Sequence, residues 1–280
     1  MIIDDIEIKW LGHSGFLIAP KSVPPHCVPG IPKKMAREYR LAKKAPGTRP
    51  VAQARPATQA RTSNEVPFMK GDVNIEGKNL TTIYIDPYNI HDDLEKADLI
   101  LLTHSHYDHC SVADIKKIIK EGTRIFLTAD CQSKIVRFNV PIKLEVVEPG
   151  QELVFGSTKI SVLPAYNVDK PFHPKDELWV GYLLKINNLL IYHAGDTDVI
   201  PEMQKLTGYK QHGKKLVALL PVGGRFTMSA EEAVEAAKLI KPDLVIPMHY
   251  GSVVGTEDDA KEFKELCKEE NINCKILEKN

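Results

Sequence analysis

Short runs of apolar and β-branched residues recur along the chain. They lie at 80–85, 99–103, 125–128, 216–221 and 244–247. Continuous apolar runs of about four to eight residues are typical of strands that are buried on both faces of a sheet. Two further runs, at 178–186 and 189–193, are separated only by Asn187 and Asn188 and predict a β-hairpin.

Helical spacing alternates with these strands. Apolar residues at 112, 115, 118 and 119 predict a helix over 112–121, and a further helix is expected over 129–137. Ser229, followed by Glu232 three residues later, forms a capping box at the start of a helix that ends before Pro242. Residues 258–271 predict the last long helix. Alternating strands and helices indicate an α/β protein.

The chain contains an internal repeat. The segments 15–18 and 83–86 resemble 181–184 and 191–196, and the segment 98–104 resembles 243–249. Each half therefore has an Asp after a hairpin, Asp86 or Asp196, and a His after a buried strand, His104 or His249. Two similar halves packed together predict a four-layer α-β-β-α sandwich, which we interpret as a single domain over 1–280.

Residues 19–71 differ from the rest. This segment has eleven basic and two acidic residues, a net charge of +9, and nine of the 19 prolines. Its only aromatic residues are Tyr39 and Phe68, so it can bury little apolar surface. The repeat places it at a hairpin tip, where a long insertion costs only a few kcal/mol of closure entropy. We expect a flexible insertion. An arm that binds RNA or a protein partner is the alternative interpretation.

Overall composition narrows the class of protein. Of the 280 residues, 43% are hydrophobic and 26% charged, as is usual for globular proteins, and no apolar run approaches the roughly 18 residues of a membrane helix. The first ten residues include three acids and do not form a signal peptide. Five scattered cysteines without a CxxC pair argue against a disulfide framework or a cysteine zinc finger. A reducing, cytoplasmic location is expected.

The strongest chemical pattern is the HxHxDH motif of His104, His106, Asp108 and His109. It follows directly after the buried strand 99–103. Imidazole and carboxylate ligands suit zinc, and also manganese or iron. On a loop beyond a strand end, two of the histidines can serve one metal while the Asp and the third His serve a second.

With this motif the chain resembles the metallo-β-lactamase-fold hydrolases. The nearest likeness is to the ascorbate-6-phosphate lactonase group. The matching stretches are LGHS at 11–14, HAGDT at 193–197, LPVGG at 220–224 and PMHY at 247–250. The resemblance covers residues 6–18 and 80–277 and leaves out the basic insertion. It implies two Zn²⁺ ions per chain, with Mn²⁺ or Fe as alternatives.

The resemblance also implies a ligand set. His104 and His106 would hold the first metal, Asp108, His109 and His249 the second, and Asp196 would bridge the two. The family usually supplies a third His to the first metal, where this chain has Asn167. Because an amide oxygen is a weaker zinc ligand, either the first metal is weakly held or another side chain replaces it. His173, six residues further on, is the clearest replacement, unless it faces the substrate or the surface.

Two adjacent cations would turn a bridging water into a hydroxide nucleophile near neutral pH. Asp108 would hold this hydroxide as well as bind metal. His13 is either a proton donor to the leaving group or a structural His. Asp86 is either an orienter of a metal-binding His or a strand-end cap. His193 is expected to pack behind the site.

Other polar residues have less specific interpretations. Cys110 is expected to be a buried thiol. Arg225 and Lys170 either contact an anionic substrate or belong to the solvated surface. The remaining histidines, His26, His91 and His212, are expected in ordinary polar loops.

The leading hypothesis is therefore an enzyme, a metal-dependent hydrolase of a small ester, lactone or phosphoester. Its partner would be a small-molecule substrate, with an anion as one option, and no membrane is implied. One alternative is a nuclease acting on RNA, as in tRNase Z, with the basic insertion gripping phosphates. Another is a non-catalytic metal-binding protein, suggested by Asn167.

Overall fold

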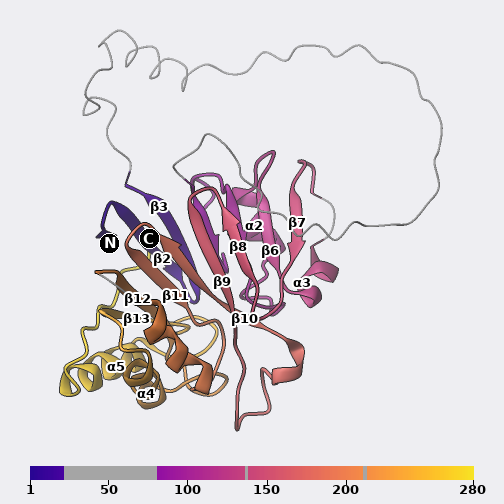
Figure 1. Ribbon diagram of the computed structural model, residues 1–280. Coiled ribbons are helices and arrows are strands. Elements are labelled where there is room, and N and C mark those ends of the chain that lie inside the picture. Colours follow the sequence, from indigo (N-terminus) through magenta and orange to yellow (C-terminus); the bar gives the residue numbers. More distant parts are fainter. Residues whose placement is uncertain (22–80, 136–137, 211–212) are drawn as a thin grey trace, which may run out of the picture. The chain divides into compact units, whose positions relative to one another are not determined.

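The computed structural model describes residues 1–21, 81–135, 138–210 and 213–280. The chain forms two mixed sheets with helices beside them (Figure 1). The basic segment 19–71 lies outside the described residues except at its start, where Ala19 and Pro20 belong to the third strand. No helix within the described ranges is long and apolar enough to span a membrane.

The first sheet has seven strands in sequential order. They are β1 (Ile2–Ile3), β2 (Ile6–Gly12), β3 (Gly15–Pro20), β4 (Ile83–Ile85), β5 (Leu99–Leu101), β6 (Arg124–Leu127) and β7 (Lys143–Val146). Neighbours up to β4 pair antiparallel, and β4 to β7 pair parallel. Strands β3 and β4 pair as a hairpin does, with Phe16 opposite Ile85, although residues 22–80 separate them.

The second sheet repeats this plan with six strands. They are β8 (Glu152–Phe155), β9 (Thr158–Pro164), β10 (Val180–Ile186), β11 (Leu189–His193), β12 (Lys215–Pro221) and β13 (Leu244–Met248). Strands β8 to β11 pair antiparallel, and β11 to β13 parallel. The two-residue connection of β10 and β11 at Asn187 and Asn188 is as the sequence predicts.

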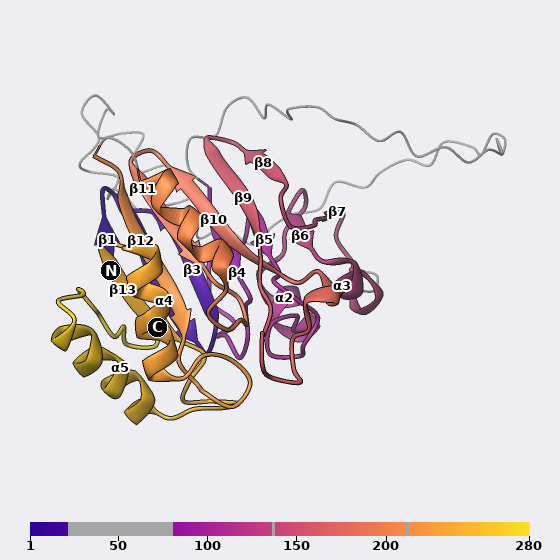
Figure 2. The ribbon, with the colours of Figure 1, turned by 60° about the horizontal axis from the view of Figure 1, so that its bottom comes forward.

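The helices lie beside the sheets. They are α2 (Val112–Ile118), α3 (Ala129–Lys134), α4 (Ala230–Ile240) and α5 (Glu257–Glu269), with two 3₁₀ segments, η1 (Lys175–Glu177) and η2 (Pro201–Tyr209). Figure 2 shows α2 and α3 near β5 and β6, and α4 and α5 near β12 and β13. The capping box of Ser229 and Glu232 is present at the start of α4. Helix α2 ends three residues and helix α5 two residues earlier than the sequence pattern suggests, and the predicted end of α3 at residue 137 lies outside the described residues.

Alternation along the central strands separates two cores. Ile83 and Ile85 of β4 pack in the core between the sheets, while Tyr84 packs in a second core with residues of α2. In β5, Leu99 and Leu101 face the first core and Ile100 the second. The central strands of both sheets are thus buried on both faces, which agrees with the expected α-β-β-α sandwich and explains the continuous apolar runs.

Candidate metal centre

The predicted site residues meet where parallel strands end. His104 follows β5, Asp196 follows β11 and His249 directly follows β13. His13 lies in the turn between β2 and β3, and His173 in the connection from β9 to β10. In sheets of this kind the carboxyl ends of parallel strands form the edge at which ligands bind.

The first group of ligand atoms comes from His104, His106, His173 and Asp196, whose ligand atoms all lie within 4.8 Å of one another. Nε2 of His104 is 3.0 Å from Nδ1 of His106, and Nε2 of His173 is 3.2 Å from Oδ2 of Asp196. Three of these side chains are buried and His106 is half-buried. We call this group cluster A.

The second group, cluster B, comes from His13, Asp108, His109 and His249, again within 4.8 Å of one another. Oδ2 of Asp108 is the common centre: Nε2 of His13 lies 2.8 Å away, Nε2 of His109 3.6 Å and Nε2 of His249 3.9 Å. All four side chains are buried. The sequence analysis expects three of them as ligands of one metal, and the structure adds His13 beside them.

Asp196 contacts both clusters. Beyond its cluster A contacts, its Oδ1 lies 3.4 Å from Nε2 of His109, and its Oδ2 lies 3.0 Å from Nε2 of His249. A single carboxylate therefore stands between the imidazoles of the two groups. This is the position that a bridging ligand requires, and bridging by Asp196 remains a prediction.

The donor atoms fit divalent cations. Nε2 of His109, Nε2 of His173 and Oδ1 of Asp196 are buried without a hydrogen-bond partner. A buried polar atom left without a partner costs about 1–3 kcal/mol, so a fold rarely keeps several in one place unless a ligand satisfies them. Imidazole nitrogens and a carboxylate oxygen that converge in this way form the donor set of zinc, manganese and iron sites.

Backbone strain concentrates at the same place. Eleven non-glycine residues in the described part of the chain have positive φ, and His13, Asp86, His173 and His249 are four of them. Each left-handed residue costs about 1–2 kcal/mol relative to an ordinary conformation. Strain of this kind is typical of residues whose side chains must point at a site. At His249 the turn also needs Gly223, where an added Cβ would lie 2.3 Å from the His249 carbonyl oxygen.

Asp86 orients His109. Its Oδ2 lies 2.8 Å from Nδ1 of His109, and its two oxygens accept hydrogen bonds from the N–H and the hydroxyl of Thr103. With Nδ1 engaged, Nε2 of His109 is the nitrogen that faces Asp196. Burial acts to lower the pKa of His109, but the carboxylates of Asp196 and Asp86 outweigh it and raise that pKa well above the usual value. Of the two interpretations of Asp86, the geometry favours the orienting one.

His173 and Asn167 occupy different positions. Nδ1 of His173 lies 3.0 Å from the carbonyl oxygen of Phe226, so its Nε2 points into cluster A. The amide nitrogen of Asn167 donates to the same carbonyl at 2.7 Å, and its backbone N–H donates to the carbonyl of His173 at 2.8 Å. The side chain that completes the cluster is therefore His173, with Asn167 hydrogen-bonded behind it.

Trp179 forms a wall of cluster A that the sequence analysis missed. The ring centroid of Trp179 lies 4.7 Å from that of His104, 4.9 Å from that of His106 and 5.3 Å from that of His173. Its indole N–H donates to Oδ2 of Asp130 at 2.7 Å. A single tryptophan in the connection between two strands is not part of any sequence pattern, so the contact could not be predicted.

Comparison with known proteins places this arrangement in a family. The model of the β-lactamase superfamily domain matches residues 73–249. A UPF0173 metal-dependent hydrolase from Thermococcus onnurineus is 38% identical over 172 residues, which is 61% of this chain and 75% of that relative. The chain belongs to the UPF0173 family of the metallo-β-lactamase superfamily.

Solved structures agree with the UPF0173 fold. A crystal structure from Parabacteroides distasonis has a TM-score of 0.66 and 23% identity, and the match covers 98% of this chain and 94% of that one. Igni18, a metallo hydrolase from Ignicoccus hospitalis, has a TM-score of 0.60 and 20% identity, with coverage of 98% and 96%. At these identities the likeness shows the fold alone, so the chemistry is argued from the site.

Both the backbone and the imidazole of His13 are hydrogen-bonded within the protein. Its carbonyl oxygen accepts hydrogen bonds from the indole N–H of Trp10 at 2.8 Å and from the N–H of His249 at 3.0 Å. Burial lowers the pKa of His13 to about 4 despite the hydrogen bond with Asp108, so the imidazole is neutral at pH 7. That hydrogen bond contributes to lowering the pKa of Asp108 to about 2 against the effect of burial.

The remaining polar residues of this UPF0173 chain lie outside both clusters. His193 contacts the carbonyl oxygen of Ser14 at 2.9 Å. Lys170 pairs with Asp198 and with Glu232, so it is bound within the protein. Cys110 is buried, whereas Arg225 and His91 are exposed. His26 and His212 lie outside the described residues.

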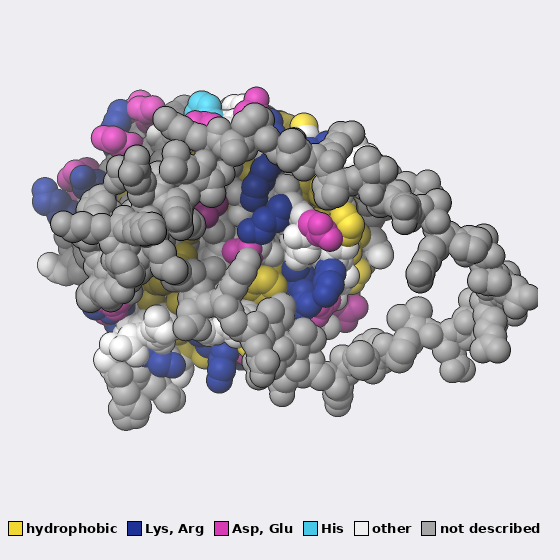
Figure 3. Space-filling view, turned by 90° about the horizontal axis from the view of Figure 1, so that it is seen from above, with side chains coloured by type: hydrophobic (Ala, Val, Ile, Leu, Met, Phe, Trp, Pro, Cys, Tyr) yellow, Lys and Arg dark blue, Asp and Glu magenta, His cyan; other side chains and the backbone are white. Residues whose placement is uncertain are grey.

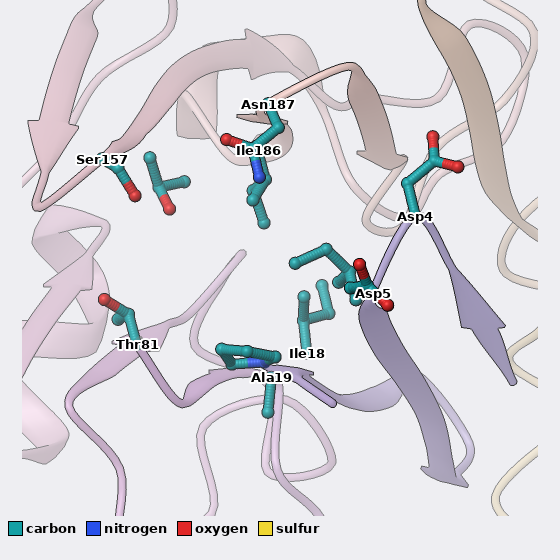
Figure 4. A pocket seen from close by; sticks show the side chains of 11 residues that line it. Asp4, Asp5, Ile18, Ala19, Thr81, Ser157, Ile186 and Asn187 are labelled. Carbon is teal, nitrogen blue, oxygen red and sulfur yellow. The ribbon is translucent and has the colours of Figure 1, made fainter. Parts of the chain in front are cut away.

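A pocket of about 430 Å³ lies far from this chemistry (Figure 4). Asp4, Asp5, Ile18, Ser157 and Asn187 are among the residues that line it. These residues stand at the hairpin turns, at the opposite ends of β3 and β11 from the clusters. The described residues that line it include no histidine and no cysteine, and we assign it no part in the reaction.

Proposed function

We propose that the chain is a hydrolase that uses two bound metal ions to activate water against a small ester, lactone or phosphoester. The observation that carries the proposal is the contact of Asp196 with both clusters. His104, His106 and His173 would hold one ion, Asp108, His109 and His249 the other, and Asp196 both. Such a pair lowers the pKa of water toward neutrality and neutralises negative charge on the attacked group.

In ester hydrolysis the oxygen of water bonds to the carbonyl carbon, the bond to the leaving oxygen breaks, and the leaving oxygen gains a proton. Asp108 remains ionised throughout, since its pKa is about 2. His13 contacts Oδ2 of Asp108, so Oδ1 is left to accept a hydrogen bond from a group that carries a proton. We assign His13 the role of holding Asp108 in this orientation. Its neutral state at pH 7 does not favour the alternative role of proton donor.

The metal that we expect is Zn²⁺, with Mn²⁺ or Fe as alternatives, because each accepts imidazole and carboxylate ligands. Two ions per chain follow from the two clusters. The likeness to the ascorbate-6-phosphate lactonases stays a prediction, and it is our reason to test lactones. The cytoplasmic location also stays a prediction. Of the two cations that the sequence suggested, Lys170 is paired within the protein and Arg225 is exposed, so Arg225 is our candidate for contact with an anionic substrate.

Elemental analysis of protein purified without added metal tests the proposal. We expect close to two ions per chain, falling to one or fewer in Asp196→Asn, together with hydrolysis of some members of a panel of esters, lactones and phosphodiesters. His91→Gln is the control, because it removes an exposed imidazole outside both clusters and should keep both ions. Two ions in wild type and in Asp196→Asn alike would contradict the role given to Asp196.

The RNA alternative depends on the basic segment, which lies outside the described residues. Figure 3 views the end of the molecule away from the clusters and shows lysine and arginine side chains among acidic ones on the visible surface. Deleting residues 22–70 separates the hypotheses. A small-molecule hydrolase keeps its rate, whereas an RNA enzyme loses affinity and the salt dependence that phosphate contacts produce. A metal-binding protein without activity would hydrolyse nothing and still bind two ions.

A further inference from the structure

Exposed apolar side chains gather beside the two clusters. Seven large hydrophobic residues are exposed in the described part of the chain. Three of them, Ile2, Leu144 and Val146, lie on β1 and β7, the edge strands of the first sheet. The other four belong to the two segments that supply cluster residues: Tyr107 (61% exposed), Val168 (57%), Leu178 (51%) and Phe172 (40%). We call these four the apolar rim.

Phe172 and Leu178 are tied to cluster A through their neighbours. Phe172 directly precedes His173, and its ring lies edge-on to that of Phe226 with centroids 4.7 Å apart. The carbonyl of Phe226 is the group that fixes Nδ1 of His173. Leu178 directly precedes Trp179, the ring that packs on His104. Both rim residues therefore lie one residue away from a side chain of the site.

Tyr107 is tied to cluster B. It stands between His106 and Asp108 in the HxHxDH motif. Its ring lies edge-on to Tyr88 with centroids 5.8 Å apart, and Tyr88 lies edge-on to His13 at 6.0 Å. A continuous series of aromatic contacts thus leads from an exposed phenol to a buried imidazole of the site.

Leu178 is held exposed in a strained conformation. It has φ 56° and ψ 31° at the end of η1, in the left-handed region that leucine rarely adopts. The side chain is also 51% exposed, so much of its apolar surface is in contact with water. Exposed apolar side chains on the segments that carry a site are typical of places that contact an apolar ligand, and substrate sites usually combine apolar walls with a few polar groups.

We infer that the substrate is a carboxylic ester or lactone with an apolar acyl or aryl group, and that the apolar rim contacts this group while the clusters attack the carbonyl. This inference rests on the proposed hydrolase function and narrows its substrate class. Each methylene fully buried against the rim should raise kcat/KM by about fourfold, the ratio that corresponds to about 0.8 kcal/mol. Four additional methylenes that are partly buried should give at least about tenfold.

The test compares p-nitrophenyl acetate, butyrate and octanoate with the metal-loaded full chain. The leaving group is constant, so differences report the acyl group alone. We expect kcat/KM for octanoate to exceed that for butyrate by at least about tenfold after correction for intrinsic reactivity. In Phe172→Ala and Leu178→Gly the ratio of kcat/KM for octanoate to that for butyrate should fall to about threefold or less. Leu178→Gly also relieves the left-handed strain, so it should not destabilise the fold.

Leu144→Ala is the matched control, because Leu144 is 39% exposed on β7 and away from the clusters. Metal content is measured in every variant, so that a disturbed His173 is recognised and not mistaken for lost acyl contact. Calorimetric titration with the free carboxylates, octanoate and acetate, measures binding without turnover. Free octanoate should bind at least about tenfold more tightly than free acetate.

The results distinguish a failure of the proposed hydrolase function from a failure of the inferred apolar substrate. Cleavage of no ester, lactone or phosphodiester by protein with two ions per chain would refute the proposed function. Cleavage of all acyl lengths at equal rates would overturn the apolar substrate while leaving the hydrolase intact. Unchanged acyl preference in both rim variants would overturn the role of the rim. A change in oligomeric state without a change in acyl preference would mark the rim as a protein interface and also overturn the inference.

Discussion

The indole nitrogen of Trp179 donates a 2.7 Å hydrogen bond to Oδ2 of Asp130, which lies 49 residues earlier in the chain. The same carboxylate receives a hydrogen bond from Thr128, the residue that caps α3. The ring of Trp179 is thereby held against His104, His106 and His173. Helix α3 contributes to the centre through this contact although it supplies no cluster residue itself.

Trp179→Ala should weaken metal binding at cluster A without removing a ligand. Loss of the indole leaves three imidazoles free to move and admits water beside them, and changes in groups that orient ligands typically cost about 10–100-fold in affinity. Competition with a chromophoric chelator measures the dissociation constants. Trp179→Phe should retain most of the packing and lose only the hydrogen bond, so its effect should be smaller. Equal affinities in wild type and Trp179→Ala would contradict the buttressing role.

Substitutions show whether Asn167 or His173 contributes more to metal binding at cluster A. His173→Ala removes the nitrogen that faces Asp196, so we expect one ion fewer per chain. Asn167→Ala removes a hydrogen bond behind that imidazole, and because the carbonyl of Phe226 still holds Nδ1, the affinity should fall by about tenfold or less. Metal content and chelator competition measure both variants. A greater loss in Asn167→Ala than in His173→Ala would make the amide the ligand.

The sequence predicts the centre well where its residues are close in the chain or repeated between the halves. The HxHxDH loop places His104, His106, Asp108 and His109 together because it directly follows a strand that must be buried. Asp196 and His249 are found because the second half repeats the strand ends of the first. In both cases a local pattern and the sheet topology determine the position.

Other parts of the centre depend on contacts that leave no local pattern. The connection from β9 to β10 has neither helical nor strand periodicity, so the sequence alone could not decide between Asn167 and His173. The carbonyl of Phe226, 53 residues after His173, decides it. The same holds for Trp179, whose partner Asp130 lies on a different element. His13 was expected near the site, but its contact with Asp108 spans 95 residues.

Asp86→Asn should lower the affinity of cluster B for metal by about 10–100-fold with little change in the packing of β4. The amide retains the size of the carboxylate but replaces one of its two acceptor oxygens by an NH2 donor, opposite the N–H and hydroxyl of Thr103 and Nδ1 of His109. His109 is then free to rotate or to change tautomer. Chelator competition reports the affinity, and the unfolding midpoint in urea reports the fold. Unchanged affinity would return Asp86 to the role of a strand-end cap.

Asp114 gives a pH dependence that is independent of the metal centre. Burial acts to raise its pKa, but hydrogen bonds from the Ser111 hydroxyl, from the N–H groups of Asn89 and Ile90, and from Lys117 lower it overall below the model-peptide value of 3.8. Since the folded pKa is the lower one, the stabilisation is fully present above pH 3.8 and disappears as the pH falls through the folded pKa.

Asp114→Asn should therefore reduce the free energy of unfolding at pH 7 by about 1–3 kcal/mol, because one of the backbone N–H groups of Asn89 and Ile90, in the loop after β4, loses its carboxylate acceptor. Below the folded pKa of Asp114 the difference from wild type should shrink, since the wild-type carboxyl is then protonated as well. Urea unfolding at pH 7 and at pH 2.5, with a chelator in both buffers, measures the difference. Asp92→Asn is the control, because Asp92 is exposed and its pair with Lys117 at 3.4 Å contributes little. A constant difference between Asp114→Asn and wild type at both pH values would show that the charge of Asp114 does not stabilise the fold.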